Sequence, residues 1–162
     1  MKKKSVINNY IRTRQKIMDL IEPLSEEKWD EIFLGKWSLK DFVAHLIGWD
    51  IWGLKASYEI LKGKLPSYYY KYYDDDWATI NGRFVKRYKK GRKKNILAAV
   101  KKSHRKLVKE LGKIPERSYN KDFGARWQGQ KVTIASDTLF QANDEETHVK
   151  QIQRWLKTGK SQ

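Results

Sequence analysis

The sequence predicts an all-α protein that folds as a four-helix bundle, and three observations support this class. Apolar residues recur at helical spacing in several long stretches, and no stretch shows the sustained alternation and hairpin turns of a sheet. Prolines and glycines lie between these stretches, where helices begin and end. The composition has no break over 162 residues, so we expect a single domain, residues 1–162.

Two elements precede the longest helical stretch. Apolar residues at helical spacing predict a first helix over residues 4–22. Pro23 ends it, because proline cannot continue the hydrogen-bond ladder. Ser25 then opens a short helical turn that carries Trp29.

The stretch from Lys36 to Lys62 predicts the second long helix, around which the others are arranged. Ser38 stands at the N-cap position and Asp41 follows three residues later, which is close to a capping box. The apolar residues between them and Lys62 cover an arc wider than one surface stripe. We therefore expect this helix to contact several neighbours inside the bundle.

The third helix is predicted in two parts, about Asp75 to Lys89 and Arg92 to Leu111, with a break at Gly91. A tyrosine cluster precedes it, and two interpretations are open: a loop that covers the mouth of the bundle, or a stacking platform for single-stranded bases (Tyr68, Tyr69, Tyr70, Tyr72, Tyr73). The three aspartates that follow favour the loop, because they would repel phosphate. After a long crossover over residues 116–132, Thr133 caps a last helix that reaches about Lys157.

Polar residues interrupt the apolar arc of the second long helix. Asp50 lies in the middle of the arc, and a buried carboxylate needs a charged or hydrogen-bonding partner. His45 shares a stripe with Trp49 and Trp52. Asp50 therefore either forms a structural hydrogen bond to a neighbouring helix or lines a functional pocket with the other three residues.

The last helix carries unusually many polar residues on its apolar side. His148 lies four residues after Asp144 and three after Glu145, and both spacings place the side chains one above the other. Gln141 lies on the same side of this helix. A core-facing helix normally has a cleaner apolar stripe, so this pattern predicts a polar pocket between the second and the last of the long helices.

One candidate for the chemistry of this pocket is a metal site. His45 on one helix, with Asp144 or Glu145 and His148 on another, supplies two imidazoles and a carboxylate, and helical bundles build metal sites from such facing side chains. This set suits one divalent zinc, nickel, iron or manganese ion with open positions for water.

The other candidate is a metal-free pocket. Here His45, His148 or His104 acts as a general base assisted by Asp50 or Asp144, since imidazole titrates near neutral pH. Trp49, Trp52, His104 and Gln141 are the residues that we expect to contact a substrate. No phosphate-binding glycine loop, serine elbow or cysteine is present, so hydrolysis would proceed through an activated water.

The charge of the chain suggests a role from a different class. The 35 Lys and Arg and 19 Asp and Glu give a net charge of +16, which attracts polyanions. Glu110 is the only acidic residue from Arg83 to Lys113. This face is either a solvated helix surface or a surface for weak, nonspecific binding of nucleic acid.

Composition and hydropathy limit the expected cellular location and partners of the protein. The chain has no cysteine, no signal-peptide core and no apolar run near the ~20 residues that span a bilayer, so we expect a cytoplasmic protein without a membrane span. We expect a small-molecule ligand and a monomer or a homodimer. A bundle whose pocket is only structural remains a third interpretation.

Two blocks resemble the ClbS/DfsB branch of the DinB-like four-helix bundles: WSLKD from Trp37 to Asp41 and AHLIGWD from Ala44 to Asp50. Weaker similarities are Asn81, the pair Ser103-His104, and the closing segment from Ile152 to Leu156. The similarity extends over nearly the whole chain.

This resemblance implies a bundle with a central pocket. In the wider DinB-like group, a histidine on the second helix and two histidines on the last hold a divalent metal. His45 and His148 match two of these positions, and the third falls on Asp144 or Glu145. One member type of the branch inactivates a DNA-alkylating metabolite by opening its cyclopropane ring, which implies, by analogy, a detoxifying hydrolase.

Overall fold

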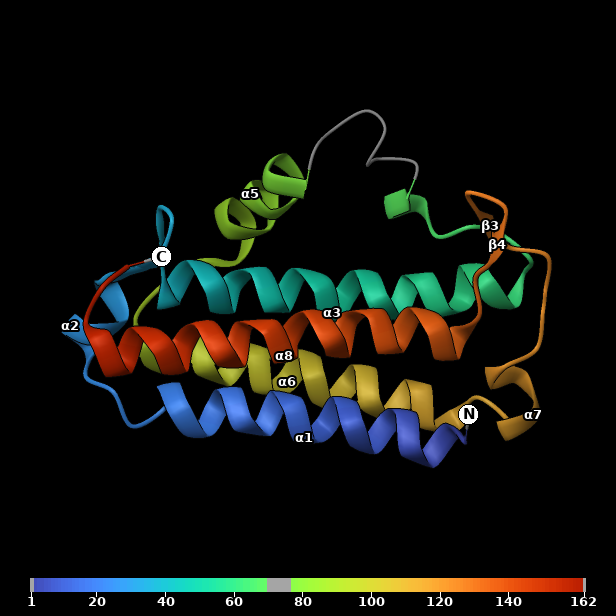
Figure 1. The fold of residues 1–162 in the computed structure, drawn as a ribbon, viewed down its shortest axis with the longest axis horizontal. Helices are drawn as coiled ribbons and strands as arrows, with labels where there is room; N and C mark the ends of the chain where they lie inside the picture. The colour runs from blue at the N-terminus through green and yellow to red at the C-terminus, as the bar shows by residue number, and fades with distance from the viewer. Residues whose placement is uncertain (1, 70–76, 162) are drawn as a thin grey trace.

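The computed structural model describes residues 2–69 and 77–161 (Figure 1). Most of the tyrosine cluster and the three aspartates that follow it lie outside the described residues. Tyr68 and Tyr69 lie inside them.

Four long helices form the bundle and run along its long axis (Figure 1). They are α1 (Lys3–Ile21), α3 (Leu39–Leu61), α6 (Lys93–Lys113) and α8 (Ile134–Thr158). Helix α1 packs against α8 and α6, and α3 packs against the same two helices, so that each helix has two neighbours around a shared core. The predicted all-α four-helix bundle is confirmed.

The helix starts follow from local capping. At the start of α3, the Ser38 side chain accepts a hydrogen bond from the Asp41 N–H, and the Asp41 carboxylate accepts one from the Ser38 N–H. Thr133 and Ser136 form the corresponding box at the start of α8. These reciprocal bonds satisfy backbone donors that have no partner within the helix.

The predicted break at Gly91 is present and separates two helices that pack differently. Helix α5 (Trp77–Tyr88) lies outside the bundle against α3, whereas α6 is one of the four bundle helices (Figure 1). Gly91 has a φ of +82°, a left-handed conformation that glycine adopts at little cost. The chain changes direction there, so that α5 covers one face of α3.

Helix was expected throughout, but the structure also contains two small antiparallel hairpins. Strands β1 (Ile32–Leu34) and β2 (Trp37–Ser38) pair across a turn at Gly35. Strands β3 (Arg126–Trp127) and β4 (Gln130–Lys131) pair within the crossover, which also contains the short helix α7 (Glu116–Tyr119). Strands this short show no alternation that a sequence pattern can reveal.

The bundle core consists of two apolar clusters separated by a polar layer. One cluster surrounds Trp29, Phe42 and Trp155, next to the short helix α2 (Glu26–Asp30) and β1. The other surrounds Ile60 and Leu111 at the opposite end. On each bundle helix, a polar residue lies in sequence between the members of the two clusters (Arg14, Asp50, Ser103, Glu145). Within the described ranges, no helix is long and apolar enough to span a membrane.

Candidate functional site

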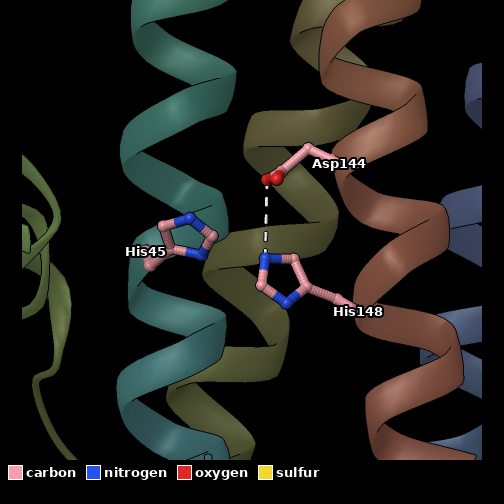
Figure 2. A group of neighbouring side chains, drawn as sticks. All are labelled: His45, Asp144 and His148. Atoms are coloured by element: carbon pink, nitrogen blue, oxygen red, sulfur yellow. Dashed lines mark ion pairs between the residues drawn. The ribbon is translucent and has the colours of Figure 1, made fainter. Parts of the chain in front are cut away.

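Helices α3 and α8 bring two histidines and one acidic residue together, and of these His45 is buried, His148 is half-buried and Asp144 is exposed (Figure 2). His45 comes from α3, and Asp144 and His148 come from α8. One nitrogen or oxygen atom from each side chain lies within 4.8 Å of the other two. His148 Nε2 is 3.4 Å from Asp144 Oδ2, and the two imidazole rings are 5.5 Å apart between centroids.

Neighbouring side chains fix the orientation of His148. Its Nδ1 lies 2.7 Å from the Gln151 side-chain oxygen, which accepts a hydrogen bond from this nitrogen. The ring also packs against Phe42, with centroids 4.9 Å apart. Because Nδ1 is held by Gln151, Nε2 is directed toward Asp144 and is the nitrogen available to a ligand.

The electrostatics of the cluster leave His45 neutral. Burial, with the nearby His148 as the next largest cause, lowers the pKa of His45 to about 3. Burial also lowers the pKa of His148, but the hydrogen bond and charge of Asp144 outweigh it and raise the pKa above its ordinary value. Burial raises the pKa of Asp144, but the hydrogen bond and charge of His148 outweigh it and lower the pKa below its ordinary value. His45 is therefore a neutral imidazole beside the close contact of His148 and Asp144.

His45 has an unsatisfied nitrogen. Its Nδ1 is buried and has no hydrogen-bond partner among the described residues. Buried polar atoms normally have a partner, so this nitrogen marks a position where a ligand or an ion is expected. The donor set of two imidazoles and one carboxylate fits a divalent transition metal.

A cavity of about 510 Å³ opens beside the cluster, within the size range of small-molecule sites. Its walls come from α3, α5, α8 and the β1–β2 hairpin, with Tyr10 of α1. Three indoles, of Trp37, Trp49 and Trp77, line it together with Phe140, and Lys36 lies at the same surface. The cavity thus combines an apolar wall with a few polar groups.

Two amides contribute polar atoms to this wall. Asn81 accepts a hydrogen bond from the Trp49 indole N–H at 2.9 Å, which links α5 to α3. Gln141 donates to the buried carboxylate of Asp137 at 3.3 Å, while its side-chain oxygen has no partner within the described part of the chain. Gly53 leaves room for this amide, because a Cβ there would lie 2.6 Å from the Gln141 oxygen.

Asp137 is a further titratable group behind the cavity wall. It accepts hydrogen bonds from the Tyr68 hydroxyl and from Gln141. Burial raises its pKa to about 6, although both hydrogen bonds act in the opposite direction. The sequence places Asp137 on the inward side of the last helix but does not reveal that Tyr68 is its partner.

Two acidic residues predicted for the site bind Arg14 in the polar layer of the core, and of the two only Glu145 also lines the cavity. Asp50 accepts hydrogen bonds from Arg14 at 2.9 and 3.1 Å and from Ser103 at 2.5 Å. Glu145 also accepts from the Arg14 guanidinium, at 3.0 Å from Nε. Of the two acids left open on α8, Asp144 therefore joins the histidines and Glu145 binds Arg14. Asp50 does not line the cavity, and its predicted catalytic role has no support from its position.

Two of the predicted substrate contacts also lie elsewhere. Trp52 packs against Phe84, with ring centroids 4.9 Å apart, and is not part of the cavity wall. His104 lies on the other side of the polar layer, with its Nδ1 3.7 Å from Asp50. Trp49 and Gln141 line the cavity, and their contact with a substrate stays a prediction.

Sequence reasoning missed Arg14 and the aromatic residues Tyr10, Trp37 and Trp77 that line the cavity. A signal for Arg14 was present, because it shares a helical stripe with Tyr10 and with the buried Ile17 and Ile21. A charged residue on such a stripe indicates a buried partner.

Comparisons with known proteins agree with this fold. A family model described as the DinB superfamily matches residues 9–152. No curated protein matches the chain.

Three solved structures share the architecture at low sequence identity. An uncharacterised protein from Escherichia coli UTI89 is 16% identical, with a TM-score of 0.75 over 98% of this chain and 94% of its own. A protein from Streptococcus pneumoniae is 15% identical, with a TM-score of 0.77 over 97% and 91%. The colibactin self-resistance protein ClbS, in complex with a dsDNA, is 17% identical, with a TM-score of 0.75 over 96% of each chain. At these identities, the similarity demonstrates the fold alone.

Proposed function

The chain belongs to the DinB superfamily, and from this premise we propose that it binds one divalent metal ion and hydrolyses a small electrophilic molecule. The ligands are His45, Asp144 and His148, and the metal is zinc, nickel, iron or manganese. The substrate occupies the adjacent cavity between α3 and α8. The role is the detoxification of a reactive compound.

The observation that carries this proposal is the unpartnered, buried Nδ1 of His45. It belongs to a neutral imidazole whose neighbours are a second imidazole and a carboxylate. A histidine that serves only the core would have its polar atoms satisfied. Gln151 orients His148 as outer residues orient metal ligands in known sites.

The residues around the cluster suit hydrolysis. When bound, a divalent metal lowers the pKa of water toward neutrality and so supplies a nucleophile at physiological pH. The indoles of Trp37, Trp49 and Trp77 exclude bulk water from an apolar substrate. The Gln141 oxygen, which has no partner among the described residues, offers an acceptor for an N–H or O–H of the substrate. The self-resistance role of ClbS, a protein of the same fold, is in keeping with a detoxifying hydrolase.

Metal analysis of protein purified without a histidine tag tests the metal site. The chain has three histidines, so His104→Ala is a matched control that removes the imidazole outside the cluster. After dialysis against zinc, wild type and His104→Ala should each retain one metal per chain, and His148→Ala should fall to background. Background metal in the wild type would overturn the metal site and leave only a metal-free pocket.

A second candidate function is nucleic-acid binding through the basic face from Arg83 to Lys113. Lys86, Arg87 and Lys90 on this face are exposed. Two other lysines already have partners: Lys89 pairs with Asp41 at 2.8 Å, and Lys93 donates to the Glu22 carbonyl at 2.6 Å. The exposed part is still strongly basic, and ClbS has been crystallised with a dsDNA.

Binding to random duplex DNA across a salt series tests this candidate. Phosphate contacts release counterions, so log affinity should fall linearly with log salt, and Lys86→Glu combined with Lys90→Glu should make the slope shallower. Lys150→Glu combined with Lys157→Glu makes the same charge change on the exposed side of α8 and should leave the slope unchanged. A slope near zero for the wild type would contradict binding to phosphate.

A further inference from the structure

A second cavity, of about 480 Å³, lies between α1 and α6, on the other side of the polar layer from the histidine cluster. Arg14 from that layer and His104 beside the layer line it. Apolar side chains from both helices form much of the remaining wall (Ile11, Met18, Val100, Val108). The residues proposed to hold the metal do not contribute to it.

The charge around this cavity is positive. Lys101, Arg105 and Lys109 recur every four residues along α6, so they lie on one stripe at the cavity. Glu22 is the only acidic residue among the described residues that line it, and it pairs with Lys101 at 2.5 Å. Arg105 and Lys109 are exposed at the rim.

The interior of this second cavity differs in charge from its mouth. The Arg14 guanidinium lies against two buried carboxylates, Asp50 and Glu145, which together exceed its single positive charge. His104 contributes its ring, and both of its buried nitrogens lack a hydrogen-bond partner within the described ranges. The unneutralised positive charge is therefore at the mouth, while the interior offers apolar surface.

We propose that this cavity is a separate binding site for an amphiphilic anion, a molecule with an apolar body and one carboxylate, sulfonate or phosphate head. The head lies at Arg105 and Lys109, where exposed cations attract it. The body lies against Met18 and Val100, where it removes apolar surface from water. Ile11, of which 40% is exposed, covers part of the body at the mouth.

A titration of the ¹⁵N-labelled full-length protein with decanoate tests the proposal. Saturable shifts should appear at the amides of Ile11, Val108 and Lys109. Decanol has a similar body and no charge, so it should bind at least several-fold more weakly. Equal binding of decanol and decanoate would overturn the role of the cationic rim.

Charge reversal provides a matched pair of variants. Arg105→Glu combined with Lys109→Glu should weaken decanoate binding about tenfold, from two exposed charge interactions. Lys102→Glu combined with Lys106→Glu makes the same change on exposed positions of α6 outside the cavity and should have little effect. Equal weakening by both variants would overturn the site, because it would indicate only net charge.

Further experiments distinguish the second cavity from the metal site, from a membrane surface and from the first cavity. His148→Ala should leave decanoate binding unchanged, so the metal site can fail while the second cavity stands. Binding to vesicles containing phosphatidylglycerol without any binding of free decanoate would overturn the proposal in favour of a membrane surface. Shifts confined to residues that line the first cavity would also overturn it.

Discussion

Two polar groups lie side by side in this bundle, and their buried atoms are satisfied to very different degrees. In the polar layer, the guanidinium of Arg14 meets the carboxylates of Asp50 and Glu145, and every one of these side chains has hydrogen-bond partners. One residue away along α8, Asp144 and His148 face His45, whose buried nitrogen has none among the described residues.

The difference teaches how to distinguish structure from function among buried polar residues. A charged group whose partners all come from the chain is a completed structural element. A group with an unsatisfied atom beside a cavity is incomplete without a ligand. Burial alone does not separate the two, because Asp50 and His45 are almost equally buried.

Removing Arg14 from its contacts with Asp50 and Glu145 should have the largest effect on stability. Arg14→Met leaves Asp50 and Glu145 buried without a counter-charge, which should lower the free energy of unfolding by about 3–5 kcal/mol. Urea denaturation followed by circular dichroism measures the loss. Arg12→Met, on the exposed side of the same helix, is the control and should change stability by less than about 0.5 kcal/mol. Similar losses in both variants would mean that the buried arginine has no special role.

The buried His45 should make the free energy of unfolding depend on pH. The pKa of His45 is about 3 in the folded protein, whereas an unfolded imidazole titrates near 6.5. Between these values the unfolded chain binds a proton that the folded chain does not bind. The free energy of unfolding of the metal-free protein should therefore fall as the pH drops from about 6.5 to about 3, by roughly 2–4 kcal/mol.

His45→Leu isolates this contribution from the other titrating groups. The variant replaces a neutral buried ring by an apolar side chain of similar size, so its stability at pH 7 should change by less than about 1.5 kcal/mol. Because the variant has no imidazole to protonate, it should lose less stability than the wild type as the pH falls, so the difference between the two proteins should grow toward pH 3. Parallel pH profiles for the two proteins would show that His45 is protonated as readily in the folded state.

The smallest expected effect concerns the support of a metal ligand. Gln151→Ala removes the hydrogen bond to His148 Nδ1 without touching the proposed ligand atoms. We expect zinc affinity to fall about tenfold, the effect typical of residues that orient metal ligands, with little loss of stability. Competition with a chromophoric chelator measures the affinity. An unchanged affinity would argue against Nε2 of His148 as a ligand.

The parts of the fold that depend on local sequence could be predicted. The capping box at Ser38 and Asp41 follows from two residues three positions apart, and the bundle helices follow from apolar periodicity. The β1–β2 hairpin could not be predicted, because its strands contain three and two residues. Its consequence for the site, the placement of Trp37 with its ring 5.1 Å from that of His45, was therefore missed as well.

The site could be predicted only as far as helical spacing determines it. The four-residue separation of Asp144 and His148 places their side chains together. The three-residue separation of Glu145 and His148 does so equally well, so helical spacing does not choose between the two acids. The choice between Asp144 and Glu145 depends on which one faces α1, where Arg14 binds Glu145. That choice is a property of helix packing. For the same reason the sequence left two alternatives open for Asp50, and the structure shows the hydrogen bonds to neighbouring helices.

Anomalous diffraction at the zinc edge, from crystals grown with zinc, tests the central claim most directly. We expect one peak between α3 and α8, about 2.0–2.2 Å from a nitrogen of His45, Nε2 of His148 and an oxygen of Asp144. An empty position there, with zinc found only on surface residues or with Glu145 released from Arg14 to bind it, would contradict the account.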